Sequence, residues 1–204
     1  MATRYAAGTL PVNANVNKVR THNLDGPNPA TVGAVPIGLG ATCVATETGS
    51  VLHQTTLTLT ALAQAVVNGT EYQGTKIYDF PAGRIYVLGV TASLQQTTTS
   101  AIDTTLNSAT GAVSVGTATA SATTLASTMV NLLPSTAFTS STVINTAGTA
   151  VGATLAAAAF FDGTSTAIDA YLNSAFATTA DVDADATMTW SGNVTITWIN
   201  LGDY

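Results

Sequence analysis

The stretch Thr75–Leu94, TKIYDFPAGRIYVLGVTASL, decides the predicted fold, and we expect the core to form around it. Residues 76–80 alternate polar and apolar side chains as a strand does, with Ile77 and Tyr78 expected on opposite faces and Phe80 on the face of Tyr78. Pro81 lacks a backbone donor and Gly83 tolerates positive φ, so the chain is expected to turn there. Residues 84–90 are apolar on both faces, as in a strand buried on both sides. The stretch therefore predicts a hairpin of two strands.

The same period-two alternation predicts further short strands along the chain. Residues 51–63 place Leu57, Leu59 and Ala61 on one face, and Asn68-Gly69 follows as a turn signal. A second hairpin is expected at 186–199, with its turn at Ser191-Gly192-Asn193 and one tryptophan on each strand. Other strands are expected at 102–106, 112–120 and 167–177.

The segments between these strands are less regular. We expect a polar loop over 95–100 and a long loop over 136–150, while 123–133 fits a short helix or a strand and 154–161 fits either. About eight strands without βα alternation indicate an all-β fold, a β-sandwich or jelly roll over residues 51–204. Residues 1–50 are broken by glycine, proline and asparagine, and they are expected to form an extended N-terminal arm.

Charged residues make up only 8% of the 204 residues, against roughly 25% in ordinary soluble domains. Such a surface is explained if partners cover much of it, and equally by a robust secreted domain with a threonine-rich surface. The arm carries Arg4, Lys18 and Arg20, whereas aspartates accumulate after Arg84. An acidic body is not expected to bind nucleic acid, because phosphates require Lys and Arg.

The lone Cys43 cannot form an intramolecular disulfide and is expected to be a small buried side chain. The N-terminal residues lack an apolar core long enough for a secretory signal. The longest apolar run, within 153–161, is too short and too rich in alanine to span a bilayer. We therefore expect a protein made in the cytoplasm, without a membrane anchor.

Several constellations suggest chemistry but are incomplete. Asp181, Asp183 and Asp185 are spaced like the start of a calcium loop, yet the glycine and the closing glutamate of an EF-hand are missing. A looser calcium site remains an alternative to a solvated acidic loop. His22 and His53 lie outside any zinc-binding spacing.

Catalytic patterns are equally incomplete. No GxSxG elbow accompanies His53, which is expected to be an ordinary strand residue. Asp79 and Asp103 are a conceivable carboxylate pair, although Asp79 is more simply an ion-pair partner of Lys76 or Arg84 across the hairpin. Gly38-Leu39-Gly40 lacks the third glycine of a dinucleotide loop, and the glycosylation patterns at Asn68 and Asn193 are expected to be chance matches. The sequence predicts no catalytic, cofactor-binding or metal-binding residues and no enzyme.

Three motifs together carry a resemblance: Tyr78–Leu94, the FDGT at Phe161–Thr164, and the terminal Thr195–Tyr204. The set resembles head decoration, or cement, proteins of tailed bacteriophages, which are built on a jelly roll. The resemblance implies a structural virion protein on the outer capsid surface that bridges major capsid protein subunits, as a homo-oligomer (dimer or trimer). It implies no cofactor, nucleic-acid or membrane partner.

Two other classes of function are kept as alternatives. A receptor- or glycan-binding β-sandwich of a phage tail or fibre would expose aromatic side chains in a concave site, with Tyr171, Trp190 and Trp198 as candidates. A hydrolase would gather His53 or a pair of carboxylates in a pocket.

Overall fold

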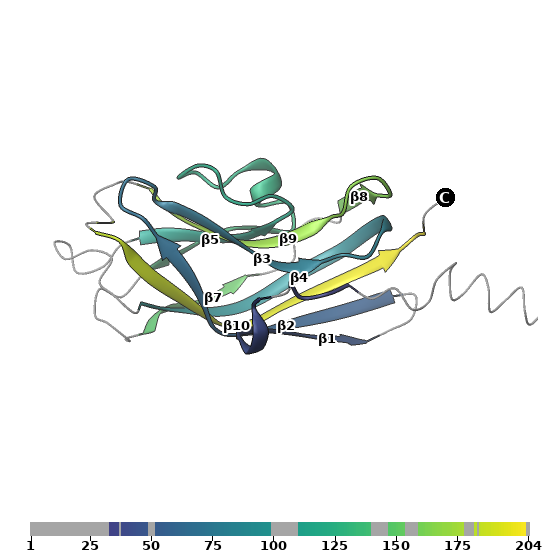
Figure 1. Cartoon of the computed structure of the whole chain (residues 1–204), viewed down its shortest axis with the longest axis horizontal. Coiled ribbons are helices and arrows are strands. Elements are labelled where there is room, and N and C mark those ends of the chain that lie inside the picture. The colour runs from purple at the N-terminus through teal and green to yellow at the C-terminus, as the bar shows by residue number, and fades with distance from the viewer. Residues whose placement is uncertain are drawn as a thin grey trace, which may run out of the picture.

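The fold is an all-β sandwich of two antiparallel sheets, as predicted, seen edge-on in Figure 1. The computed structural model describes residues 33–36, 38–48, 52–98, 110–139, 147–153, 159–177, 182 and 184–202. Its elements are, in order, η1 (Gly40–Thr42), β1 (Cys43–Thr48), β2 (Leu52–Val66), β3 (Tyr72–Asp79), β4 (Gly83–Thr98), β5 (Thr110–Gly116), η2 (Ser127–Met129), β6 (Leu133–Thr139), β7 (Ala147–Ala153), β8 (Ala159–Gly163), β9 (Asp169–Phe176) and β10 (Ala186–Asn200). The two helical elements are single 3₁₀ turns, so no described helix could cross a membrane.

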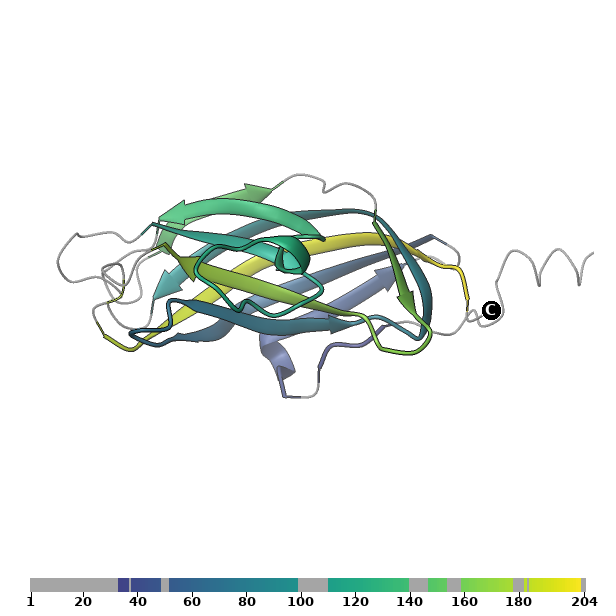
Figure 2. The ribbon, with the colours of Figure 1, turned by 90° about the horizontal axis from the view of Figure 1, so that it is seen from above.

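Six strands form the large sheet, in the order β1-β2-β10-β4-β7, with β8 also paired to β4. Four strands form the small sheet, in the order β3-β9-β5-β6. The long strands β2, β10 and β4 lie side by side beneath the small sheet (Figures 1 and 2). All the named pairings are antiparallel, so the chain changes sheet through its connections rather than through crossover helices.

The Thr75–Leu94 stretch forms two strands, but they are not a hairpin. β3 pairs with β9 in the small sheet, whereas β4 pairs with β10 in the large sheet. The turn at 81–82 is therefore a corner that passes the chain from one layer to the other. The stretch is rich in apolar residues because both strands contribute to the core: Ile77 and Tyr78 before the corner are fully buried, and so are Ile85 and Val90 after it.

The C-terminal segment is one continuous strand and not the predicted hairpin. β10 pairs with β4 without interruption across Ser191 and Gly192. The neighbouring strand β2 absorbs an extra residue there, because Trp190 pairs with Leu62 while Gly192 pairs with Leu59. This bulge reverses the alternation of β2, so Ala61, at φ +50°, is exposed and does not share the buried face of Leu57 and Leu59 as predicted.

Other predicted segments differ in extent. The expected loop over 95–100 is strand as far as Thr98, and Gln96 within it is buried. Residues 123–133, which fit a short helix or a strand, contain only the 3₁₀ turn η2 within a loop, and β6 begins at Leu133. The expected loop over 136–150 contains the end of β6 and the start of β7. The strand predicted at 167–177 is confirmed as β9. The strand predicted at 102–106 lies outside the described residues.

One continuous core fills the space between the sheets. Trp190 and Trp198 both point into it from the same face of β10, and neither is exposed. Trp190 packs edge-to-face on Phe138 of β6, and Trp198 packs edge-to-face on Phe80 near the corner after β3. Each such aromatic contributes on the order of 150–250 Å² of buried area, so β10 organises both ends of the core.

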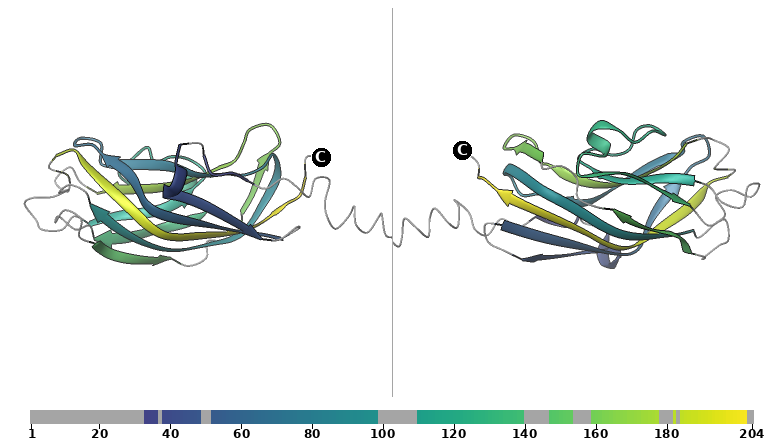
Figure 3. Two further views of the ribbon diagram at one scale, coloured as in Figure 1. Left: turned by 60° about the horizontal axis from the view of Figure 1, so that its bottom comes forward. Right: turned by 180° about the vertical axis from the view of Figure 1, so that it is seen from behind.

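The body begins before residue 51, where the predicted arm was expected to end. β1 pairs residue by residue with β2, from Cys43 with Leu59 to Thr48 with Gln54. Before it, Ala34 pairs with Asp79 at the margin of the small sheet. Residues 33–36 and 38–42, which we call the strap, thus connect the two sheets along one side of the sandwich (Figure 3).

Candidate functional site

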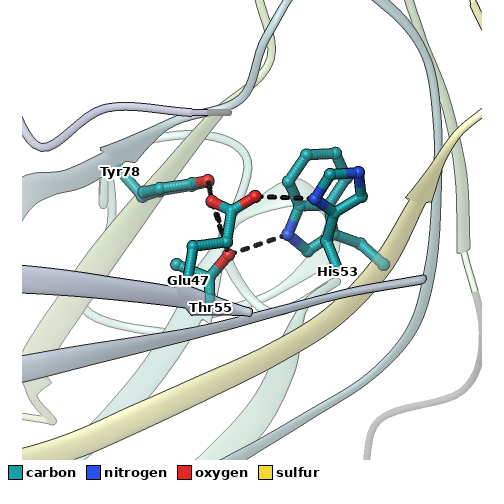
Figure 4. Close-up of polar contacts among 5 residues, drawn as sticks. Glu47, His53, Thr55 and Tyr78 are labelled. Atoms are coloured by element: carbon teal, nitrogen blue, oxygen red, sulfur yellow. Dashed lines mark hydrogen bonds and ion pairs between the residues drawn. The ribbon is translucent and has the colours of Figure 1, made fainter. Parts of the chain in front are cut away.

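The most concentrated group of polar side chains lies inside the sandwich, where β1, β2, β3 and β10 meet (Figure 4). It consists of Glu47, His53, Thr55, Tyr78 and Trp198, which we call the Glu47 cluster. His53 and Thr55 point inward because they occupy alternate positions of β2, in phase with Leu57. Glu47 is the inward-facing acidic residue of β1.

The carboxylate of Glu47 accepts three hydrogen bonds. His53 donates from Nδ1 to Oε1 over 2.7 Å, while the Tyr78 hydroxyl donates to Oε2 over 2.7 Å. The Thr55 hydroxyl donates to Oε2 over 3.2 Å. A partly buried carboxylate is costly unless it is paired and hydrogen-bonded, and these three donors satisfy it.

The remaining contacts fix the donors themselves. Trp198 donates from Nε1 to the Thr55 hydroxyl over 2.9 Å, and its indole stacks on the His53 ring with centroids 4.2 Å apart. Burial, together with the neighbouring Glu47 carboxylate, raises the pKa of Tyr78 far above its ordinary value, against the opposing effect of Thr55. Tyr78 therefore stays protonated and continues to donate.

The Glu47 cluster contains a histidine beside a carboxylate, the pair that general-base catalysis uses. A shallow hollow of about 530 Å³ lies between the strap and the start of β1. It is lined by Gly33, Val35, Pro36, Gly38, Gly40, Cys43, Val44 and Ala45. None of the five cluster residues lines that hollow. The hydrogen bonds within the cluster join β3 of the small sheet to β1, β2 and β10 of the large sheet.

A second group of buried polar side chains, centred on Gln64, links the two sheets at the other end of β2. Gln64 accepts hydrogen bonds from Trp190 Nε1, over 2.9 Å, and from the Ser174 hydroxyl, over 2.7 Å. Its amide nitrogen donates to the Leu172 carbonyl over 2.8 Å. Each tryptophan of β10 is thus anchored by an inward polar residue of β2, and Gln64 links the large sheet to β9 of the small sheet.

The predicted candidate residues do not converge on one place. Asp181, Asp183, His22 and Asp103 lie outside the described residues. Asp185 accepts a hydrogen bond from the backbone N–H of Asn68 over 3.0 Å, which fastens the turn after β2 to the start of β10. Within the described part of the chain, no three His, Cys, Asp or Glu side chains are grouped as a metal would require.

Asp79 is an ion-pair partner of Lys76, as predicted, although the two lie on the same strand and not across a hairpin. Lys76 also contacts Asp169 of β9 over 3.3 Å. The hydrogen bond to Asp79 is the main cause that raises the pKa of Lys76, and burial raises the pKa of Asp169. Arg84 pairs with Asp162 of β8 over 3.9 Å. These contacts are half-exposed surface ion pairs.

The sequence reasoning did not single out Glu47, and it placed this residue in the arm. One signal was available: in the alternating run 43–48, Glu47 shares its face with Cys43, the residue expected to be buried. It also missed the charge-free outer surface that β1, β2 and β10 form on the large sheet. β2 and β10 contain no Lys, Arg, Asp or Glu, and the single such residue of β1, Glu47, is turned toward the core.

Threonines from adjacent strands form a row across this outer surface. Thr46 pairs with Thr56, Thr56 with Thr195, and Thr195 with Thr91, so one row crosses β1, β2, β10 and β4. Hydroxyls of Thr56 and Thr195 lie 3.4 Å apart. The next row contains Thr58, which donates to Asn193 over 3.0 Å. We call this surface the threonine face.

Comparisons with models of protein families, with curated proteins and with solved structures find no match for this chain.

Proposed function

We propose that this chain is a structural virion protein of a tailed bacteriophage, which decorates the capsid and bridges subunits of the major capsid protein. The proposal starts from the resemblance carried by Tyr78–Leu94, Phe161–Thr164 and Thr195–Tyr204. The observation that supports it best is the threonine face. An extended surface without charged side chains is typical of a region that other subunits cover in an assembly.

The threonine face has the chemistry of a contact surface. Its methyl groups can be buried without a large penalty, while its hydroxyls can donate or accept hydrogen bonds to a partner. On β4 the only Lys, Arg, Asp or Glu is Arg84, at the end of the strand, where it pairs with Asp162. Covering a charged surface is costly because its ions lose their water. A partner bound over the centre of the threonine face would not remove water from any charged side chain.

The opposite face of the sandwich is different. A loop at 117–132 lies on the outer side of the small sheet and is fastened there by Asn173, whose side chain contacts Ala118, Ala120 and Met129. The same sheet carries the charged group of Lys76, Asp79 and Asp169. The small sheet is thus partly covered and charged, so we assign the capsid contact to the large sheet.

The buried aromatic residues count against the alternative of a glycan-binding tail or fibre protein. That function requires exposed aromatic rings, yet Trp190 and Trp198 are fully buried. Tyr171 is half-buried, and its hydroxyl contacts Asp169 over 3.2 Å. The three aromatic residues predicted for a glycan site therefore do not support this alternative.

The proposal is tested by adding the purified protein to heads that lack it and measuring the bound copies per head by quantitative gel analysis and electron microscopy. We expect saturable binding at repeated lattice positions. Thr56→Lys with Thr91→Lys places two charges in the middle of the threonine face and is expected to reduce binding at least tenfold, since two buried unpaired charges are costly.

Ser165→Lys with Thr166→Lys is the matched control. These residues lie in the exposed turn after β8, so the same added charge is placed away from the threonine face. Binding of this control should equal that of the unmodified protein. No binding to heads by the unmodified protein would refute the proposed function, whereas equal loss in both variants would refute the assignment of the face.

A further inference from the structure

The outer edge of β1 is an open strand edge in the described structure. β1 lies at one end of the large sheet, and β2 is its only described partner strand. In an antiparallel pair, alternate residues turn their backbone N–H and C=O groups to the other side, so an edge strand displays unpaired donors and acceptors. All six residues of β1 pair with β2 in one unbroken register, which leaves a regular edge.

β1 lacks the devices that protect the edges at β3, β6 and β8. Proteins commonly protect edge strands with proline, lysine, a bulge or a covering segment. The edge of β3 contains Lys76 and is covered at its end by Ala34, which exchanges two backbone hydrogen bonds with Asp79, of 2.9 and 2.7 Å. β6 contains Pro134, and β8 has only five residues. β1 contains no proline, glycine or lysine.

A hollow lies beside this edge. It is bounded by the strap on one side and by Cys43, Val44 and Ala45 of β1 on the other. Val44 is 50% exposed there. An open edge next to a partly apolar hollow is the combination by which sheets accept an added strand, because backbone bonds supply affinity and side chains enter the hollow.

A segment of suitable chemistry lies at 1–32, the residues before the strap, which we call the leader. Residues 12–17 of the leader, VNANVN, alternate apolar and asparagine side chains over six residues, the length of β1. Arg4, Lys18 and Arg20 against Asp25 give the leader a formal charge of +2, which leaves −8 for the remainder of a chain whose total is −6. The leader and the body are therefore complementary in charge.

We propose that Val12–Asn17 of one copy adds as an antiparallel strand to the outer edge of β1 in a second copy. Of the possible registers, one places Asn15 opposite Thr46 and Val16 opposite Ala45. The asparagines then extend the uncharged threonine face, while the valine side chain points toward the hollow. The addition needs no capsid, so it can be tested separately from the proposed function.

Disulfide trapping between two different copies of the full-length chain tests the proposal. One copy carries Asn15→Cys, and the other carries Thr46→Cys and a tag that changes its mass. Directly paired residues of adjacent strands have Cβ atoms about 4.5–5.5 Å apart, close enough for a disulfide after small adjustments. Native Cys43 is buried and burial raises its pKa to about 11, so its thiol stays largely unreactive at neutral pH.

The matched control replaces Thr46→Cys by Thr91→Cys, which lies in the same threonine row but on β4, away from the edge. We expect the mixed dimer to form several-fold more with Thr46→Cys than with Thr91→Cys, and to fall to the control level when the donor copy also carries Val12→Asp and Val16→Asp. Equal yields for the two acceptor copies would overturn the proposal, as would trapping that is unaffected by the two aspartates. Far-UV circular dichroism confirms that each variant is folded.

Discussion

Glu47 joins three strands, because its carboxylate receives donors from β2 and β3 while it belongs to β1. Its three donors are not equivalent. The Tyr78 hydroxyl is fully buried, so removing it leaves a carboxylate oxygen with a weaker set of partners and no replacement by water.

Tyr78→Phe is expected to lower the free energy of unfolding by about 1.5–3 kcal/mol, the usual range for a hydrogen bond to a charged group. Tyr86→Phe is the matched control, since Tyr86 is only partly buried on β4 and no described group bonds its hydroxyl. The control should change the free energy by less than about 0.5 kcal/mol. Urea denaturation measures both, and equal effects would contradict the role of Tyr78.

Cys43 predicts how stability changes in alkali. Burial raises the pKa of its thiol from the ordinary 9.0 to about 11 in the folded protein. A group whose pKa is raised on folding stabilises the protein below its unfolded pKa, and this contribution is lost as pH rises through the folded value. We therefore expect the loss to fall between pH 9 and 11 and to amount to about 2–3 kcal/mol.

Tyr78 acts in the same direction at higher pH, because its pKa is raised from an ordinary 10.0. Cys43→Ala should therefore remove the decline between pH 9 and 10 and leave the later one. Urea midpoints measured at half-unit steps of pH check this. A variant that declines as the unmodified protein does from pH 9 would show that the thiol is not the group responsible.

At the scale of elements, Ser191-Gly192-Asn193 shows why a turn signal can occur inside a strand. Gly192 has φ +127°, which is rare for other residues, and a Cβ at this position would lie 2.1 Å from the Ser93 carbonyl oxygen of β4. The glycine is required because the backbone of β10 lies unusually close to the neighbouring strand β4 at this point, opposite the bulge of β2. The sequence has the residues of a turn, but the partner strands on both sides keep β10 extended.

Gly192→Ala is expected to lower the free energy of unfolding by about 2–4 kcal/mol, since it combines an unfavourable φ with a collision against backbone. Gly40→Ala is the matched control. Gly40 also has a positive φ, of +54°, but a Cβ there meets no atom within 4 Å. The control should cost roughly 1–2 kcal/mol, the conformational penalty alone. Thermal unfolding measures the stability of both variants. Equal losses would show that the added Cβ at position 192 does not collide with β4.

The strands could be predicted from the sequence better than their pairing could. The alternation of apolar and polar residues located β9 and most of β2. This pattern depends only on which face of a strand is buried, and not on which strand lies next to it. It could not assign β3 and β4 to different sheets, since a Pro-Ala-Gly corner and a hairpin use the same residue types. The Glu47 cluster was not predicted, because it is assembled from residues far apart in the chain, whose inward direction depends on the fold.

At the scale of the whole molecule, β10 is the strand whose side chains reach both ends of the core. This strand extends along the long axis of the sandwich, between β2 and β4, and contributes a tryptophan to each end of a single continuous core. Inward polar residues of β2 fix both indoles, Thr55 at one end and Gln64 at the other. The main core cluster contains residues of both sheets and both tryptophans, so we expect the sandwich to unfold as one cooperative unit.

The two tryptophans make this cooperativity measurable. Trp190→Phe leaves Trp198 to report on the end near β1 and β3, whereas Trp198→Phe leaves Trp190 to report on the end near β6. Within each variant, the urea midpoint from tryptophan fluorescence should coincide with the midpoint from far-UV circular dichroism, because β10 cannot leave one end of the core without disturbing the other. The variants will differ from each other in stability, so the comparison is made inside each one. A fluorescence midpoint well below the dichroism midpoint in either variant would show that one end opens first, and that β10 does not couple the two ends.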